Sequence, residues 1–364
     1  MIIQEVIDFL EETTPLAYAE GFDNVGLLVG DTNNVVTGVL VTLDTLEEVV
    51  QEAIDKNCNL IISFHPIIFQ GLKKLTGKTY VERAVMKAIK NDIAIYAIHT
   101  ALDNSFQGVN ARICDRLGLT NRQILMPQCH TIQRLVTYVP EKDADFLRQK
   151  LFEAGAGNIG NYSECSFNLK GIGTFKGNEQ SHPTIGIPNK FHQENEVQIG
   201  VIFPKHLQKN ILKALFLHHP YEEVAYEIYT LENQHQHIGL GMIGELPSPM
   251  QEKEFLSFVK ENMQTSCIRH SALLGKPIQK VAVLGGSGAE AIEACLAKQC
   301  DAYITSDIKY HEFFKAENKI LLADIGHYES EQFTKMLLWE QLKEKFTTFA
   351  LYLADTNTNP INYL

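Results

Sequence analysis

Four short apolar segments, each ending in a histidine or an acidic residue, constrain the fold of this chain most strongly. They are residues 60–65, 93–99, 302–307 and 320–327. Apolar runs of this length between turn residues, rich in Ile and Tyr, are typical of buried parallel strands. In open α/β sheets the ligand crevice lies at the carboxyl ends of the strands. We therefore expect the polar residues at these ends to converge, although they lie far apart in the sequence.

Helical patterns alternate with strand patterns in the first and last thirds of the chain. The first third has strands predicted at 35–44, 59–65 and 93–99, and helices predicted at 1–15, 45–56, 79–90 and 109–117. The last third has strands predicted at 280–284, 302–307, 320–327 and 347–353, and helices predicted at 289–298, 311–318 and 328–346. Such alternation implies βαβ units and a mostly parallel sheet.

The middle third has a different pattern. Its strands are predicted at 133–140, 197–203 and 225–231, its helices at 144–154 and 207–217, and a glycine-rich region spans 155–177. The order β-α-β-β-α-β is that of a ferredoxin-like unit. We therefore predict an α/β fold in which a two-part, alternating α/β metal-binding core (1–128 and 237–364) carries an inserted ferredoxin-like α+β domain (129–236).

Composition limits the classes of function. The net charge of −12 argues against general nucleic-acid binding, which needs a basic surface, although a local pocket for one phosphate stays open. No apolar stretch approaches 18 residues, so no membrane span is expected. The acidic N-terminal segment does not resemble a signal peptide, and none of the seven cysteines has CxxC spacing. We expect a cytoplasmic protein with reduced thiols.

The strand-end residues are candidates for a metal centre. His327 and Glu331, four positions apart on a helical turn, face the same way, and His65 and Asp103 follow other strands. Imidazole and carboxylate groups are ligands that Zn, Fe or Mn accept. His99 is predicted to be a nearby hydrogen-bonding or acid/base residue. Two alternatives stay open, since Glu331 suits a helix N-terminus and Asp103 suits an N-cap.

Other polar motifs have competing interpretations. Asp307 either orients a histidine ligand or caps a helix, and His311 either meets a substrate phosphate or lies on the surface. The turn 285–288 either cradles an anion or is only a tight strand-to-helix turn. Residues 239–244 match GxGxxG but lack the following helix, so a dinucleotide fingerprint is not expected. The pattern favours a structural role for His218 and His219, and a solvated loop for Lys73, Lys74 and Lys78.

Five motifs together resemble the Nif-three-like family, whose members are called GTP cyclohydrolase 1 type 2 homologues. They are GFDNVGLLVG (21–30), FHPIIF (64–69), HTALDN (99–104), ITSDIKYH (304–311) and GHYESE (326–331). In the middle third, GAGNIGNY (155–162), GTF (173–175) and HPYEE (219–223) resemble a PII-like or CutA-like domain of the longer bacterial members. The resemblance covers nearly the whole chain.

The resemblance implies a dinuclear divalent-metal site with His65, Asp103, His327 and Glu331 as ligands and Glu331 as the bridge. It also implies a toroidal homohexamer whose sites face an internal cavity. The family usually has two consecutive histidines before the proline, whereas the first is Phe64 here. Phenylalanine cannot bind a metal ion, so one or two ions per subunit are expected, with water, His99 or a substrate atom filling the gap.

Two functional hypotheses follow. The first is a metal-dependent hydrolase of a nucleotide-like small molecule, with metal-activated water as the nucleophile and His99 as a proton shuttle. GTP ring opening is the reaction that the resemblance implies, and phosphoester hydrolysis fits the same ligands. The second is a non-enzymatic, oligomeric metal-binding scaffold or regulator whose PII-like insertion senses a metabolite or a partner.

Overall fold

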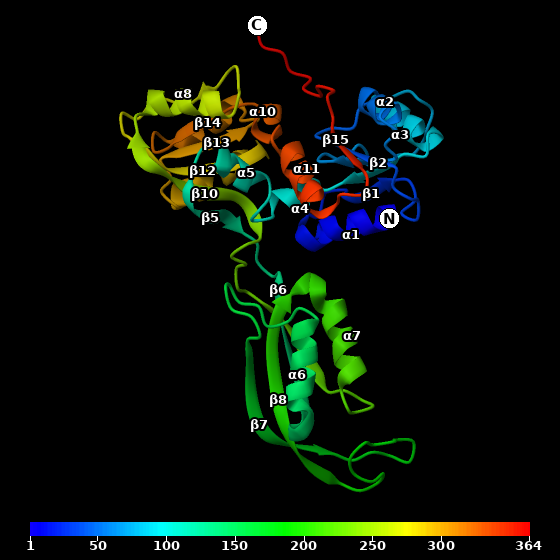
Figure 1. The fold of residues 1–364 in the computed structure, drawn as a ribbon. Coiled ribbons are helices and arrows are strands. Elements are labelled where there is room, and N and C mark those ends of the chain that lie inside the picture. Colours follow the sequence, from blue (N-terminus) through cyan, green and yellow to red (C-terminus); the bar gives the residue numbers. More distant parts are fainter. The chain divides into compact units, whose positions relative to one another are not determined.

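The computed structural model describes residues 1–364, which form two compact units. One unit combines Met1–Pro127 with His237–Leu364, and the other is the segment Gln128–Gln236 (Figure 1). The first unit contains two sheets, and the second contains one. No helix is both long and apolar enough to cross a membrane.

The first sheet of the core unit has the strand order β1-β4-β3-β2-β15. The strands are β1 (Gly26–Val29), β2 (Gly38–Thr42), β3 (Leu60–Ser63), β4 (Ala94–Ala97) and β15 (Ala350–Leu353). β15, β2, β3 and β4 are parallel, and β1 is antiparallel to β4. The last strand of the chain therefore completes a sheet built from the first hundred residues.

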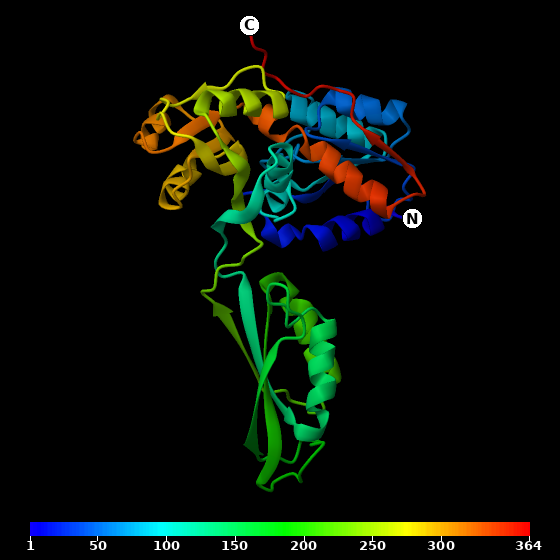
Figure 2. The same cartoon turned by 60° about the vertical axis from the view of Figure 1, so that its left-hand side comes forward.

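Both faces of this sheet are covered by helices (Figure 2). One face packs on α2 (Glu47–Asp55) and α3 (Tyr80–Lys90), and the other on α1 (Ile3–Thr13) and α11 (Thr334–Lys345). Along β2, Leu40 points into the first layer, whereas Val39 and Val41 point into the second. A strand buried on both faces explains the continuous apolar runs of the sequence.

The second sheet of the core unit has the order β11-β14-β13-β12-β10-β5. Its strands are β5 (Thr120–Pro127), β10 (Gly239–Met250), β11 (Arg269–His270), β12 (Ile278–Ser287), β13 (Ala302–Ser306) and β14 (Leu321–Asp324). β12, β13 and β14 are parallel, and the other pairings are antiparallel. Helix α9 (Ile292–Ala297) covers one face, and α5 (Val109–Arg116) and α8 (Glu252–Asn262) cover the other.

The inserted unit is a four-stranded antiparallel sheet with two helices. Its elements are β6 (Ile132–Pro140), α6 (Ala144–Glu153), β7 (Ser166–Phe175), β8 (His192–Pro204), α7 (Gln208–His218) and β9 (Tyr226–Leu231). The sheet order is β7-β8-β6-β9, and both helices pack on one face through Leu147, Leu151, Ile211 and Leu215. This order and topology are those of a ferredoxin-like fold.

The predicted α/β core and ferredoxin-like insertion are therefore confirmed, with differences in the details. The helix predicted over 328–346 is interrupted, because α10 (His327–Glu331) ends before α11 begins. The helix predicted at 311–318 is a 3₁₀ helix, Tyr310–Ala316. The antiparallel strands β1, β5, β7, β10 and β11 were not predicted. β1 is a run of only four residues, and β7 lies in the segment that was predicted only as glycine-rich. The GxGxxG match lies inside β10, paired on both sides.

Candidate metal centre

Three histidines from the carboxyl ends of strands in both sheets meet at one place. His65 follows β3, His99 begins the short helix α4 (His99–Asp103) after β4, and His327 begins α10 after β14. The ring centroid of His65 lies 5.2 Å from that of His99 and 5.6 Å from that of His327. The sequence predicted this convergence from the strand ends alone.

Each of these histidines has its Nδ1 atom held by an aspartate. His65 donates to Asp44 at 2.8 Å, His99 to Asp23 at 2.9 Å, and His327 to Asp307 at 2.7 Å. A carboxylate can only accept a hydrogen bond, so Nδ1 carries the proton in each neutral imidazole. The Nε2 lone pair is then available, which is the usual arrangement of histidine ligands in metal sites.

Glu331 lies between two of these imidazoles. Its Oε2 atom is 3.2 Å from Nε2 of His65 and 3.2 Å from Nε2 of His327, yet it makes no hydrogen bond with either ring. One ligand atom from each of the three residues lies within 4.8 Å of the others. The side chain of Glu331 is only 3% exposed, so water does not satisfy this oxygen. A buried carboxylate oxygen that makes no hydrogen bond and lies beside two Nε2 atoms fits a divalent cation.

The electrostatics of the cluster favour a positive charge at this position. Burial opposes protonation of His65, but Asp44 and Glu331 outweigh it and raise its pKa to about 10. For His327, Asp307 and Glu331 likewise outweigh burial and raise the pKa to about 11. The same negative field that stabilises an imidazolium ion would stabilise a bound divalent cation, which displaces the protons.

Asp103 lies at the end of α4 and is buried in the same neighbourhood. Its Oδ1 atom makes no hydrogen bond, and the side chain is 7% exposed. Burial raises the pKa of this carboxyl well above its usual range, and the negative charge of Glu331 raises it further. Asp103 is outside the three-residue group formed by His65, His327 and Glu331. A cation beside Asp103 would relieve its repulsion with Glu331. The role of Asp103 as a ligand stays a prediction.

Two sequence alternatives are wrong. Asp103 is the last residue of α4 and does not cap a helix N-terminus. Glu331 is the last residue of α10, so it is not a first-turn acid favoured by the helix dipole. The sequence left two roles open for Asp307, orienting a histidine or capping a helix. Its hydrogen bond with His327 favours the first role.

His99 and Phe64 lie beside His65 at the edge of the three-residue group. His99 has φ +23°, a conformation that a non-glycine residue rarely adopts, and such strain gathers at functional sites. Its Nδ1 partner Asp23 also accepts hydrogen bonds from the backbone and hydroxyl of Thr100. The ring of Phe64 is fully buried and lies 4.8 Å from His65 and 5.5 Å from His99, measured between centroids. Phe64 thus fills the place beside these histidines without offering a ligand.

Residues 285–287, predicted as part of a turn, are the last residues of β12, and the two glycines among them shape the cluster. The N–H groups of Gly285 and Gly286 donate to Asn110 and Ser330, so they are not free for an anion. Gly286 has φ +71°, and a Cβ atom built there would lie 2.4 Å from Oε1 of Glu331. Glycine is therefore required for the close approach of Glu331 to this strand end.

The remaining motifs lie outside the cluster. His219 donates from Nε2 to the Tyr138 carbonyl and accepts at Nδ1 from the Tyr221 N–H, which is a structural role. His311 is exposed and its ring packs on Tyr310. Lys73, Lys74 and Lys78 are exposed loop residues, as a solvated loop requires.

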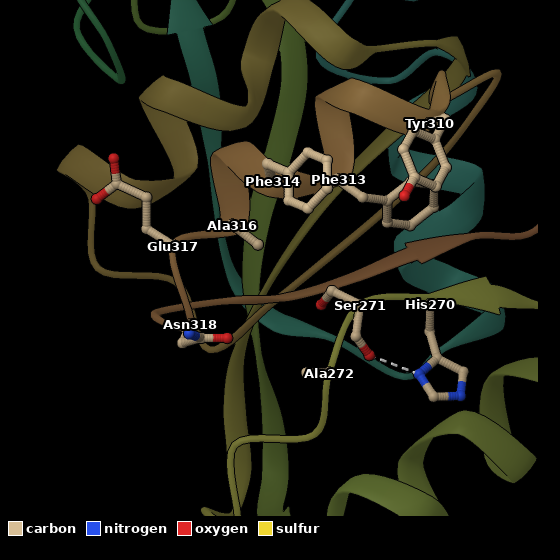
Figure 3. A pocket seen from close by; sticks show the side chains of 9 residues that line it. All are labelled: His270, Ser271, Ala272, Tyr310, Phe313, Phe314, Ala316, Glu317 and Asn318. Carbon is tan, nitrogen blue, oxygen red and sulfur yellow. Dashed lines mark hydrogen bonds between the residues drawn. The ribbon is translucent and has the colours of Figure 1, made fainter.

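A cavity of about 390 Å³ lies at the edge of the second sheet, between β11 and the 3₁₀ helix Tyr310–Ala316. Figure 3 shows His270 and Ser271 on one side of it and the rings of Tyr310, Phe313 and Phe314 on the other. None of the histidines or acids of the cluster lines this cavity. It is therefore separate from the candidate metal centre.

Two orienting residues were given no role from the sequence. Asp44 follows a predicted strand, so the strand-end argument that selected His65 also pointed to it. Asp23 precedes β1 and follows no strand. It reaches His99 because β1 runs antiparallel to β4, with Gly26 paired to Ala97, and this pairing is not encoded in the local pattern.

The fold and the cluster together define an α/β protein with a His/Glu group that can hold a divalent cation and a ferredoxin-like insertion. The family model of Duf34/NIF3 (NGG1p interacting factor 3) matches residues 1–360. The chain belongs to the Duf34/NIF3 family.

Relatives with the same full-length arrangement include a GTP cyclohydrolase 1 type 2 homolog of Bacillus subtilis. It is 37% identical over 99% of this chain and 98% of its own length. A solved Bacillus cereus protein related to NIF3 superposes with a TM-score of 0.87 at 36% identity, covering 100% of this chain and 99% of that one. A Staphylococcus aureus structure superposes with a TM-score of 0.80 at 29% identity, with the same coverage.

Proposed function

We propose that this protein is a metal-dependent hydrolase of a nucleotide-like small molecule. The observation that carries the proposal is the buried Oε2 atom of Glu331, which makes no hydrogen bond and lies 3.2 Å from the Nε2 atoms of His65 and His327. His65, His327 and Glu331 would hold the ion, with Asp103 as a further ligand. One or two ions of Zn, Fe or Mn per subunit suit these donors. A divalent cation supplies Lewis acidity, which lowers the pKa of a bound water toward neutrality.

The residues around the ligands supply orientation and proton transfer. Asp44 and Asp307 fix the rings of His65 and His327, so the ligand atoms are already arranged before a cation arrives. His99, oriented by Asp23, accepts a proton from an attacking water and returns it to the leaving group. Its ring lies 5.2 Å from that of His65, measured between centroids, so it stands beside the reacting position.

The substrate class is proposed from the names of the relatives. They are called GTP cyclohydrolase 1 type 2 homologs, and GTP ring opening is a hydrolysis that begins with attack of water on the purine ring. The same groups suit phosphoester hydrolysis. We therefore extend the proposal to nucleotides as a class rather than to GTP alone.

The test combines metal content with turnover. Elemental analysis of the wild type, Glu331→Ala and His99→Gln is paired with a screen of GTP and nucleotide phosphoesters on the same samples. We expect metal-dependent turnover in the wild type, loss of metal and turnover in Glu331→Ala, and loss of turnover with retained metal in His99→Gln. Turnover that survives complete removal of metal by a chelator would contradict the proposal.

We further propose that the chain forms a homo-oligomer, a toroidal hexamer. Large aromatic side chains are unusually exposed at the edge of the second sheet, with Tyr310 73% and Phe314 65% accessible in the single chain. Exposed apolar patches of this kind mark contact surfaces. Light scattering on the purified protein tests this directly. A monomer at micromolar concentration would contradict it.

A second candidate function is that of a regulator whose insertion binds a small ligand. A cavity of about 310 Å³ in the inserted unit is lined by Phe175, Tyr221 and Glu196. Glu196 accepts a hydrogen bond from the Tyr221 hydroxyl on Oε1. A carboxylate beside two aromatic rings suits an organic cation. Calorimetric screening of small amines against the wild type and Glu196→Gln tests this candidate. Equal binding by both proteins, or none by the wild type, would contradict it.

A further inference from the structure

The eleven residues after β15, 354–364, extend to the C-terminus (the red segment in Figure 1). They form no helix or strand, and most of them are exposed. Ala354, next to β15, and Thr358 are instead buried, at 3% and 8% exposure. A buried threonine between more exposed residues indicates a specific partner. We refer to residues 355–360 as the strap.

The strap makes hydrogen bonds with three different parts of the core unit. The N–H groups of Asp355 and Thr356 donate to Glu52 on α2, at 2.8 and 3.0 Å. Asn359 donates from Nδ2 to Glu329 of α10 at 3.2 Å. Because α10 carries His327 and Glu331, the strap connects the helices of the first sheet to the segment that supplies two candidate ligands.

The central contact of the strap reaches a histidine of the cluster through one residue. The Thr358 hydroxyl donates to Oδ2 of Asp44 at 2.7 Å, and Oδ1 of the same carboxylate accepts from Nδ1 of His65 at 2.8 Å. Each of the two oxygens of Asp44 is thus held by a different donor. The carboxylate cannot rotate about its terminal bond without losing one of these hydrogen bonds.

We propose that Thr358 is a positioning residue of the metal centre, acting through Asp44 to fix the ring of His65. This inference rests on the proposed function, because it requires that His65 bind the cation. Without the hydroxyl, Asp44 keeps only its hydrogen bond with His65, so the two side chains can turn together and the Nε2 atom of His65 is less well fixed in direction. Residues that orient a metal-binding histidine typically contribute 10–100-fold to metal affinity. Thr358 lies one step further away, so we expect a loss of about 5–10-fold in affinity for Zn²⁺.

The experiment is a Zn²⁺ titration of the full-length protein in competition with a chromophoric chelator. Thr358→Val keeps the shape of the side chain and removes the hydroxyl, and Thr358→Ser restores the hydroxyl. Thr356→Val is the matched control, because Thr356 lies on the same strap and its hydroxyl donates to Glu52 instead of Asp44. We expect weaker Zn²⁺ binding in Thr358→Val and wild-type affinity in Thr358→Ser and Thr356→Val.

A double variant separates positioning from general loosening of the tail. In an Asp44→Asn background, Thr358→Val should cause less than a twofold further loss of affinity, because its route to His65 is already altered. Zn²⁺ affinity unchanged in Thr358→Val, or reduced equally in Thr356→Val, would overturn the inference and leave the metal centre intact. A wild-type protein that binds no Zn²⁺ would refute the proposed metal centre as well.

Discussion

At the scale of single residues, the candidate site depends on how closely a few side chains approach one another. Three aspartates orient three histidines, and Glu331 reaches the Nε2 atoms of two of them. Such an arrangement is sensitive to small changes in volume, because the carboxylate of Glu331 lies against the backbone of Gly286. Two substitutions test this description.

Gly286→Ala should weaken metal binding at least tenfold, because the new Cβ atom would lie 2.4 Å from Oε1 of Glu331. Gly275→Ala is the matched control, since Gly275 also has φ +71° but nothing lies within 4 Å of its built Cβ atom. The positive φ costs either variant about 1 kcal/mol of stability. Elemental analysis and chemical denaturation measure both effects. Equal metal content in the two variants would argue against the proposed position of Glu331.

Phe64→His should increase the metal content, because Phe64 lies beside His65 and His99 and offers no ligand atom. We expect a rise from about one ion per chain toward two, measured by elemental analysis after equilibration with Zn²⁺. The change buries a polar ring, so stability should fall by about 1–3 kcal/mol. Two ions already bound in the wild type would show that another group replaces the missing histidine.

At the scale of elements, the tail after β15 is tied to α2 by Glu52. This carboxylate accepts hydrogen bonds from Lys56 and from the backbone and hydroxyl of Thr356. Burial alone would raise the pKa of Glu52, but these donors, together with the Asp355 N–H, lower it to about 2. The ionised form is therefore the one that joins the tail to the helix.

Glu52→Gln should destabilise the protein by about 2 kcal/mol at pH 7, since it removes a charge that accepts several hydrogen bonds. A depressed pKa stabilises the folded state above the pKa of the unfolded chain, near 4.5, and this stabilisation disappears as the pH falls toward 2. The difference between wild type and variant in unfolding free energy should therefore shrink between pH 5 and pH 2. Glu48→Gln, an exposed position on the same helix, is the control and should change stability by less than about 0.5 kcal/mol. A difference independent of pH would contradict this account.

At the scale of the whole molecule, the chain leaves and re-enters the core unit at one place. β5 ends at Pro127 and β10 begins at Gly239, and these two residues are paired across the antiparallel ladder. The strands that flank the insertion thus already form the two arms of a hairpin. The two parts of the core unit are also joined at another place, because β15 from the last part of the chain pairs with β2 from the first part.

Replacing residues 128–236 with Asn-Gly should therefore leave a folded core, because the resulting loop of Asn, Gly, His237 and Ile238 has a length that commonly joins antiparallel strands in a hairpin. We expect cooperative thermal unfolding of the shortened chain and metal content equal to that of the wild type. Calorimetry and elemental analysis check both points. An unfolded product or loss of the bound ion would mean that the insertion is required for the core.

The amino-acid sequence determined the elements and their class. Buried parallel strands need continuous apolar runs, so the strands that end near His65, His99 and His327 were predictable, as was the ferredoxin-like order of the insertion. The strand-end rule also selected Glu331 and Asp103. Local pattern was enough for these residues because each one lies either next to the end of its strand or in the short helix that follows it, α4 for Asp103 and α10 for Glu331.

Only the tertiary structure decided which distant residues support this cluster. Asp23 reaches His99 through the antiparallel pairing of β1 with β4, and Thr358 reaches Asp44 through the parallel pairing of β15 with β2. Neither contact has a local signature, because strand register is set by packing across the sheet rather than by neighbours in the chain. The interruption between α10 and α11 was not predictable for a similar reason, since α10 makes a long-range contact with β12, where the Gly286 N–H donates to the Ser330 hydroxyl.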